Sequence, residues 1–136
     1  MNKVEYTANP AVSDIDFITE KINKETTEYG EAYPFAFFIR DAKSNIIAGA
    51  NGYVMYGEIY TDQLWVDKSY RRIGVGKKLM DAIHQYGKKE GCHLATVQTM
   101  SFQNAKDFYE RCGYVVELER FGYNNKSSCF LLKREL

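Results

Sequence analysis

The sequence lacks most of the features that mark specialised protein classes. Its 136 residues include two prolines, Pro10 and Pro34, and one tryptophan. No apolar run approaches the ~20 residues of a membrane-spanning helix, and residues 1–10 lack the apolar core of a signal peptide. The 18 basic and 18 acidic side chains cancel, so binding to nucleic acid or membranes through bulk charge is not expected. We expect a cytoplasmic protein with neither kind of partner.

Cysteine and histidine are also scarce. Cys92, Cys112 and Cys129 are odd in number and lack the spacing of a disulfide framework or a zinc site. His84 and His93 have no partner at the spacing of metal ligands, so both are interpreted as structural. We therefore expect that the protein binds no metal ion and is located in a reducing compartment.

What is present indicates a folded α/β protein. Apolar residues make up 45% and aromatic residues 15% of the chain, and the length predicts a single domain over residues 1–136. Periodicity and turn residues predict the order β-α-β-β-β-α-β-α-β-β. The expected ranges are strand 3–7, helix 13–30, strands 34–40, 46–57 and 58–67, helix 75–90, strand 93–100, helix 104–113, and strands 114–121 and 127–136. Residues 58–100 indicate a right-handed crossover between parallel strands within an otherwise antiparallel, mixed α+β sheet.

The strand EIYTDQLWVD is expected to lie in the middle of the sheet. Strict alternation divides it into two faces, with Glu58, Tyr60, Asp62, Leu64 and Val66 on one and Ile59, Thr61, Gln63 and Trp65 on the other. Both faces carry apolar groups near the C-terminal end, which is typical of a central strand.

The segment YRRIGVGKKLM follows that strand and opens a helix. Gly74 and Gly76 have no Cβ, so a phosphate could approach the unpaired amides of the helix N-terminus closely. The turn is surrounded by four basic side chains, Arg71, Arg72, Lys77 and Lys78. On these residues alone an anion site and an ordinary strand-to-helix turn with surface charges both remain open. The Walker and dinucleotide-binding patterns do not fit.

Two motifs together resemble one family. RRIGVG matches the pattern [QR]-x-x-G-x-[GA] of the GCN5-related N-acetyltransferases, the GNAT superfamily. NAKDFYERCGY resembles the same family's A-x-x-[LF]-Y-E-[KR]-x-G-[FY]. The resemblance covers residues 58–116 by motif and the whole chain by element order. It implies the GNAT acyl-CoA N-acyltransferase fold and an acetyl-CoA-dependent N-acetyltransferase.

The resemblance also implies a cofactor site. The turn amides would hold the pyrophosphate of acetyl-CoA, and these are Arg71, Arg72, Ile73, Gly74, Val75, Gly76 and Lys77. The pantetheine arm would pair with the main chain of Leu64, Trp65 and Val66, which requires strands 60–66 and 94–99 to separate at their C-terminal ends. Phe102 stands where many relatives have a cofactor-contacting Asn. Asn104 either contacts the cofactor or caps the following helix.

The implied reaction is acetyl transfer to an amine. By resemblance Tyr109 is the general acid, although its place on an apolar helix face also fits plain core packing. The base is left open between Asp62, Glu58 and ordered water, with Asp62 preferred because it lies closer to the thioester end. The acceptor would be a small-molecule amine or a peptide or protein amine, and tyrosines with carboxylates around the expected substrate site favour a small cationic amine.

Other interpretations remain. A non-catalytic acyl-CoA-binding or protein-interaction module of the same fold is the main alternative, and an RNA-binding domain using the four basic residues is disfavoured by the neutral net charge. A homodimer is expected to form, if it does, by edge-to-edge pairing of strand 127–136.

Overall fold

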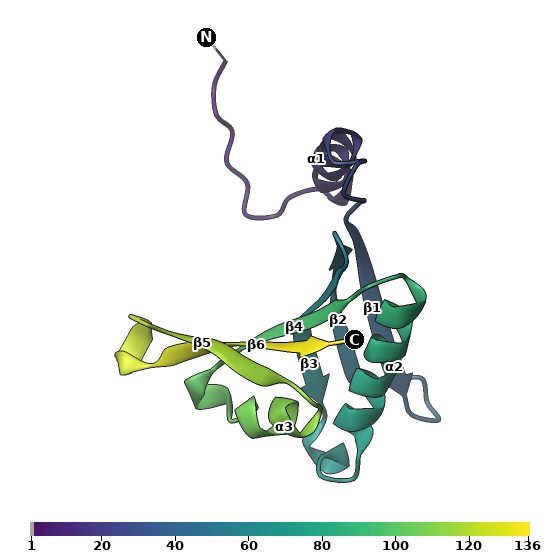
Figure 1. Ribbon diagram of the computed structural model, residues 1–136, viewed down its shortest axis with the longest axis vertical. Helices are drawn as coiled ribbons and strands as arrows, with labels where there is room; N and C mark the ends of the chain where they lie inside the picture. The colour runs from purple at the N-terminus through teal and green to yellow at the C-terminus, as the bar shows by residue number, and fades with distance from the viewer. Residues whose placement is uncertain (1) are drawn as a thin grey trace.

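The computed structural model describes residues 2–136, which form one six-stranded mixed sheet and three α-helices (Figure 1). The elements are α1 (Val12–Glu25), β1 (Tyr33–Arg40), β2 (Ile46–Met55), β3 (Glu58–Val66), η1 (Lys68–Tyr70), α2 (Val75–Lys89), β4 (Leu94–Met100), η2 (Ser101–Gln103), α3 (Lys106–Arg111), β5 (Val115–Phe121), η3 (Asn124–Lys126) and β6 (Ser128–Glu135). The strand order is β1-β2-β3-β4-β6-β5. Within residues 2–136 only β3 and β4 pair in parallel, and the other strand pairs are antiparallel, which confirms the predicted mixed sheet.

The two N-terminal predictions are partly wrong. Residues 3–7 do not form a strand, and their apolar side chains face solvent, since Val4 is 99% and Tyr6 89% exposed. Alternation over five residues does not make a strand without a neighbouring strand to pair with. The first helix is shorter than predicted and ends at Glu25. The chain from Thr26 to Ala32 forms the turn into β1.

The core lies between one face of the sheet and the helices α2 and α3. The largest fully buried side chains are Ile59, Met80, Ile83, Val97 and Leu132, contributed by β3, α2, β4 and β6. The apolar residues of α2 recur at helical spacing and all turn toward the sheet, which is why this helix was predictable from the sequence. Gly87 lets α2 approach β3 closely, because a Cβ there would lie 2.8 Å from Ile59 Cγ2.

A β-bulge in β3 overturns the predicted faces of this strand. Asn51 of β2 pairs with Gln63, but the next residue, Gly52, pairs with Thr61, so Asp62 is the extra residue of β3. Before the bulge the predicted alternation holds, and Thr61 is buried under α2. After it the faces exchange, so Leu64 packs against the core while Trp65 is 50% exposed on the outer face.

Strand β6 has no free edge. It pairs with β4 on one side and with β5 on the other, so the predicted edge-to-edge dimer through residues 127–136 is wrong. The edges of the sheet are β1 and β5. Among the described residues, no helix is both long and apolar enough to cross a bilayer.

Candidate functional site

The parallel strands β3 and β4 separate halfway along. Their pairing runs from Glu58 with Leu94 to Thr61 with Val97 and then stops, while β3 continues to Val66 against β2 alone. The predicted separation of these strands is therefore confirmed. Thr61 Oγ1, at the point of separation, is the one buried side-chain polar atom of residues 2–136 without a hydrogen-bond partner.

The free edge of β3 offers main-chain groups to this gap. The amide of Asp67 donates to Ile47 O at 2.8 Å, so the antiparallel alternation turns Trp65 toward β2 and turns Leu64 and Val66 toward the gap. The Val66 carbonyl already accepts a hydrogen bond from Arg71 Nε at 2.7 Å. Of the three predicted residues on this strand, Leu64 and Val66 present main-chain groups to the gap and Trp65 does not.

The glycine turn carries six consecutive unpaired amides. Within the described chain, no protein acceptor is found for the N–H groups of residues 72–77, whereas Arg71 N donates to Lys68 O and Lys78 N donates to Gly74 O. No side chain caps this end of α2. Since α2 is 15 residues long, its dipole adds about half a positive charge to these amides. The turn therefore presents a positive, hydrogen-bonding surface suited to phosphate.

The two glycines of the turn have different roles. Gly74 has φ +88°, in the left-handed region, and a Cβ there would meet nothing within 4 Å. A Cβ on Gly76 would lie 3.1 Å from the ring of Phe108 and 3.8 Å from Val66. Gly74 thus shapes and exposes the turn, and Gly76 lets α2 pack against α3 and β3.

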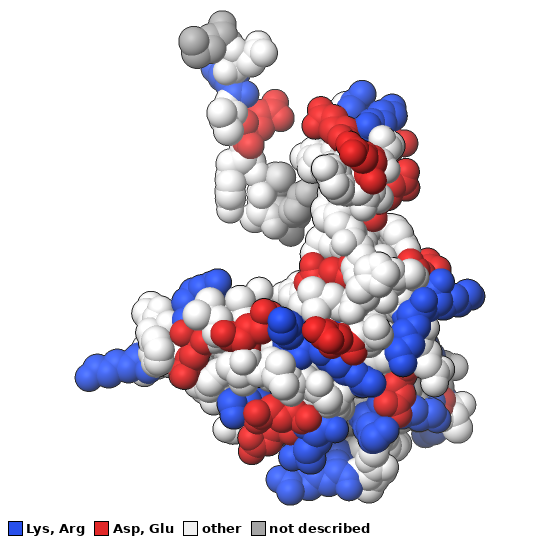
Figure 2. All heavy atoms as spheres, viewed as in Figure 1, with Lys and Arg blue, Asp and Glu red and all other residues white. Residues whose placement is uncertain are grey.

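The basic side chains of the turn are only partly engaged. Figure 2 shows Lys and Arg side chains gathered at the end of the molecule where α2 begins. Lys77 forms an exposed ion pair with Asp81 at 2.8 Å, which raises the pKa of the lysine by a hydrogen bond and by charge attraction. Arg71 is held on the Val66 carbonyl. Arg72 and Lys78 are exposed and form no ion pair with another described residue.

Tyr109 lies on the side of α3 that faces the core. It is 6% exposed, and its ring packs edge-on against Phe108 at 5.2 Å and Tyr114 at 5.8 Å between centroids. Its hydroxyl forms no hydrogen bond with the rest of the described chain, yet it is not fully enclosed. Burial, with smaller effects of Cys112 and Tyr60, raises the pKa of Tyr109 to about 12. The phenol is therefore protonated at every physiological pH and can donate a proton.

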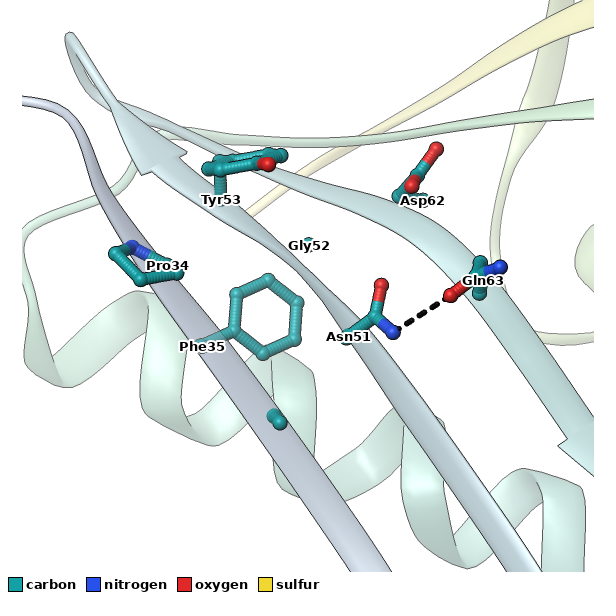
Figure 3. A pocket seen from close by; sticks show the side chains of 8 residues that line it. Pro34, Phe35, Asn51, Gly52, Tyr53, Asp62 and Gln63 are labelled. Atoms are coloured by element: carbon teal, nitrogen blue, oxygen red, sulfur yellow. Dashed lines mark hydrogen bonds between the residues drawn. The ribbon is translucent and has the colours of Figure 1, made fainter. Parts of the chain in front are cut away.

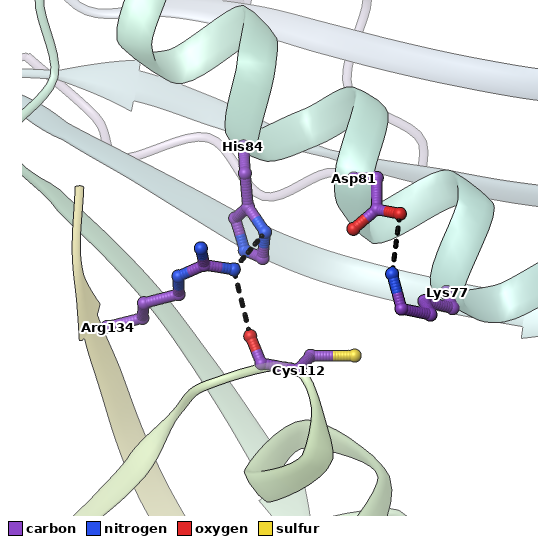
Figure 4. Close-up of polar contacts among 5 residues, drawn as sticks. All are labelled: Lys77, Asp81, His84, Cys112 and Arg134. Atoms are coloured by element: carbon purple, nitrogen blue, oxygen red, sulfur yellow. Dashed lines mark hydrogen bonds and ion pairs between the residues drawn. The ribbon is translucent and has the colours of Figure 1, made fainter.

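A polar network behind Tyr109 was not predictable from the sequence. His84 Nε2 and Tyr114 Oη lie 2.8 Å apart. Arg134 Nη1 lies 2.9 Å from His84 Nδ1 and donates to Cys112 O at 3.0 Å (Figure 4). Because arginine can only donate, Nδ1 accepts and Nε2–H donates to the tyrosine. Burial, and then Arg134, lowers the pKa of His84 to about 4. Its partners lie 30 and 50 residues away, so no local pattern signals them.

The two candidate carboxylates have different surroundings. Asp62 lies on the bulge and is exposed, and the Tyr60 hydroxyl points at its Oδ1 over 3.5 Å. Burial, followed by Asp62, raises the pKa of Tyr60. Glu58 lies at the start of β3, in the paired part, where its carboxylate accepts a hydrogen bond from Thr96 Oγ1. The two therefore do not form one site, and only Asp62 lies beyond the point where the strands separate.

An open pocket of about 550 Å³ lies beside Asp62 on the sheet face opposite α2 (Figure 3). Its lining residues are Pro34, Phe35, Ala36, Asn51, Gly52, Tyr53, Asp62 and Gln63. Asn51 donates to Gln63 Oε1 at 2.8 Å, which holds the two amides together at its floor. Asn51 and Gln63 were not among the predicted site residues, because the bulge that brings Asp62 and Gln63 to the surface together has no local signal.

Asn104 does not cap α3. It has φ +56°, and the N-cap position belongs to Ala105, which makes no side-chain cap. The Asn104 side chain is exposed and forms no hydrogen bond with another described residue, so it is available to a ligand. No group of three or more His, Cys, Asp or Glu side chains within residues 2–136 has a metal-binding arrangement.

Comparisons with known proteins point to one family. A sequence model described as the Acetyltransferase (GNAT) family matches residues 8–114. A blasticidin-S acetyltransferase from Streptomyces morookaense is 30% identical over 103 residues, which are 75% of this chain and 75% of the relative. A crystal structure from Agrobacterium tumefaciens, assigned as an acetyltransferase, has a TM-score of 0.81 at 22% identity, with 100% of both chains covered.

A further solved structure contains acetyl coenzyme A. A Bacillus anthracis protein assigned as a streptothricin acetyltransferase, crystallised with acetyl coenzyme A, has a TM-score of 0.67 at 24% identity. The likeness covers 81% of this chain and 67% of that one. At such identities the two structures show that the fold is shared.

Proposed function

This chain belongs to the GNAT acetyltransferase family, and from that premise we propose that it transfers the acetyl group of acetyl-CoA to a small cationic amine. The observation that carries the proposal is the row of six free amides at residues 72–77, next to the unpaired edge of β3. Free amides at a helix N-terminus can bind a diphosphate. An unpaired strand edge can pair with an extended arm that contains amide groups.

Acetyl-CoA would bind along one continuous surface. The amides of the turn, Arg72 through Lys77, would hold the diphosphate, with the exposed Arg72 and Lys78 adding charge. The pantetheine arm would pair with Leu64 and Val66 at the edge of β3. Arg71 would then act through its bond to the Val66 carbonyl, which fixes the turn against the strand. Asn104 is an additional candidate contact.

The reaction needs one proton removed and one supplied. The amine nitrogen attacks the thioester carbonyl, the carbon–sulfur bond breaks, and the new carbon–nitrogen bond forms. A free alkylamine has a pKa near ~10.4, so its proton must pass to a base, for which Asp62, directly or through water, is the proposed group. Tyr109 would protonate the departing thiolate, and its raised pKa of about 12 keeps that proton available.

The pocket beside Asp62 supports a small cationic acceptor. It combines the Tyr53 ring, the Asn51 and Gln63 amides and one carboxylate, a set that suits a positively charged amine. The relative from Streptomyces is named for the antibiotic blasticidin S, which makes antibiotic-like amines the first panel to test. A peptide or protein amine is the alternative acceptor.

The first prediction concerns Tyr109→Phe. We expect kcat to fall by about 10²-fold while the Kd for acetyl-CoA stays within twofold, because the hydroxyl acts only when the thiolate leaves. The measurement is thiol release over an amine panel, with calorimetry for binding. Tyr33→Phe is the matched control, since burial and Glu90 also raise the pKa of Tyr33 to about 12, but it lies on β1 beside the end of α2.

Three results would change the proposal. Unchanged turnover in Tyr109→Phe would remove this residue from the chemistry and leave it as core. Binding of acetyl-CoA without turnover across the panel would favour a non-catalytic acyl-CoA-binding module. No measurable affinity for acetyl-CoA would overturn the proposed function altogether.

A further inference from the structure

Helix α1 has an apolar stripe that nothing covers. None of its side chains is buried, and Val12, Ile15, Ile18 and Ile22 recur on one side while being 45–75% exposed. Figure 1 shows α1 standing away from the sheet, beyond β1. A 14-residue helix is marginal in water by itself, so its stability depends on packing of this stripe against another surface.

The outer face of β1–β3 is a second uncovered apolar surface. Phe38, Tyr53 and Trp65 lie on it and are each about half exposed, while α2 packs on the opposite face through Tyr86 with Phe35 and Phe37. Two hollows open on this outer face: the pocket beside Asp62, and a smaller one of about 240 Å³ bordered by Phe38 and Trp65. A convex apolar helix and a hollowed apolar sheet face are complementary surfaces.

The connection between α1 and β1 holds these two surfaces of one chain apart. The Asn23 side chain bonds both main-chain groups of Ala32, accepting from its N–H at 2.8 Å and donating to its C=O at 3.0 Å. Thr26 Oγ1 donates to Gly30 O at 3.0 Å, and the Gly30 amide donates back to Thr26 O. These bonds fix the short turn with α1 directed away from its own sheet.

We propose that the protein forms a two-fold dimer by exchanging α1, so that the stripe of each helix packs on the outer face of β1–β3 of the other copy. A second copy is the occupant because the same chain carries both complementary surfaces and keeps them apart, which is the condition for an exchanged dimer. A stable interface buries about 1,600 Å² in total, about 800 Å² from each partner, and in the exchanged dimer two symmetric helix-on-sheet contacts would share this area.

The exchange would also complete the acceptor pocket. In one chain the pocket beside Asp62 is open on the outer side, and the partner's α1 lies across this face in the dimer. This second consequence rests on the proposed function, whereas the dimer itself does not. It predicts that an acceptor binds between the sheet of one copy and the helix of the other.

The mass of the protein tests the dimer. Light scattering of the wild type should give twice the 15.7 kDa mass of one chain. The variants Ile18→Lys and Phe38→Glu should each give the mass of one chain, and circular dichroism should show that both are folded. Phe17→Glu is the matched control: Phe17 lies on the opposite side of α1, is 59% exposed and contacts Lys21, so this variant stays dimeric. A monomeric wild type, or a dimer that persists in Ile18→Lys and Phe38→Glu, overturns the proposal.

Mixing the two monomeric variants tests the exchange. The intact helix of Phe38→Glu can pack on the intact sheet of Ile18→Lys, and the second contact sets Lys against a Glu-bearing face, so a heterodimer should form. If the dimer does not exchange α1, mixing the two variants yields no heterodimer, and that result contradicts the proposal.

Activity of the mixture tests the pocket separately. Only the site on the Ile18→Lys chain is complete in the heterodimer. Adding Tyr109→Phe to that chain should lower the restored turnover by about 10²-fold. Adding it to the Phe38→Glu chain, whose own site is incomplete, should leave the restored turnover unchanged. If Tyr109→Phe lowers turnover equally from either chain, the proposal that the partner's α1 completes the pocket is refuted. If neither the wild type nor any variant turns over an amine, the proposed function fails while the mass measurements still decide the dimer.

Discussion

At the scale of single residues, backbone conformation decides whether the turn can bind an anion. Gly74 adopts φ +88°, and a Cβ at this position would meet no neighbouring atom within 4 Å. Arg72, with φ +64°, adopts the same left-handed conformation although it carries a side chain. In this conformation the amides of residues 72–77 have no acceptor among the described residues. The chemical identity of the basic side chains matters less, since Lys77 and Arg71 are already engaged within the protein.

Replacing Gly74 therefore tests the turn directly. We expect Gly74→Ala to lower the free energy of unfolding by about 1 kcal/mol and to weaken acetyl-CoA binding roughly tenfold, because a methyl group would enter the space proposed for the diphosphate. Gly122→Ala is the matched control. Gly122 also has positive φ, +101°, and open space around it, but it lies in the β5–β6 connection. Equal effects of the two substitutions on affinity would argue against the anion site.

At the scale of elements, the bulge in β3 organises the site. It exposes Asp62 and Gln63 together, and it exchanges the faces of the strand so that Leu64 and Val66 lie under α2. Gly52 on the opposite strand permits the bulge, because a Cβ there would lie 1.8 Å from Tyr60 O. The separation of β3 from β4 begins at the adjacent position.

Gly52→Ala should consequently disrupt the strand pair. We expect a loss of about 3 kcal/mol, or roughly 10 °C in Tm, since backbone atoms of β3 must move to accommodate the methyl group. Gly49→Ala is the control on the same strand. Its Cβ would lie 2.9 Å from the Phe38 ring, a side chain that can shift, and the nearest backbone atom, Phe37 O, would lie 3.3 Å away rather than 1.8 Å. Thermal unfolding followed by circular dichroism would compare them, and comparable losses would contradict the special role of the bulge.

At the scale of the whole molecule, Arg134 joins three parts of the chain. It reaches from β6 to His84 of α2 and to the Cys112 carbonyl after α3, and His84 in turn bonds Tyr114. Tyr114 packs against Tyr109, so the network supports the position of the proposed acid. Besides Arg134, the charged groups that act on His84 are Asp81, Lys88 and Lys77, and burial has the largest effect.

This network makes stability depend on pH. The unfolded chain protonates His84 near pH ~6.5 but the folded protein only near pH 4, so the unfolded state binds the extra proton between these values. Stability attributable to His84 is therefore complete above pH ~6.5, falls as pH drops, and levels off below 4, a loss of about 3 kcal/mol. In His84→Gln that part of the dependence should vanish. Denaturant unfolding of both proteins from pH 7 to 4 measures it, and parallel curves would contradict the assignment.

Neighbours within a few residues are enough to specify part of this protein. The stripe of α2, the glycine turn before it and the Tyr109 helix follow from local periodicity and backbone freedom, and their motifs identify the family. The bulge at Asp62, the gap beside β3, the partners of His84 and the position of α1 became apparent only in the folded chain. The bulge, the gap and the partners of His84 depend on hydrogen bonds or packing between separate strands and helices. The position of α1 depends instead on the bonds of Asn23 with Ala32 and of Thr26 with Gly30, and residues 3–7 form no strand because no neighbouring strand pairs with them. A local pattern cannot encode which distant strand pairs with which residue, and that pairing is what shapes this site.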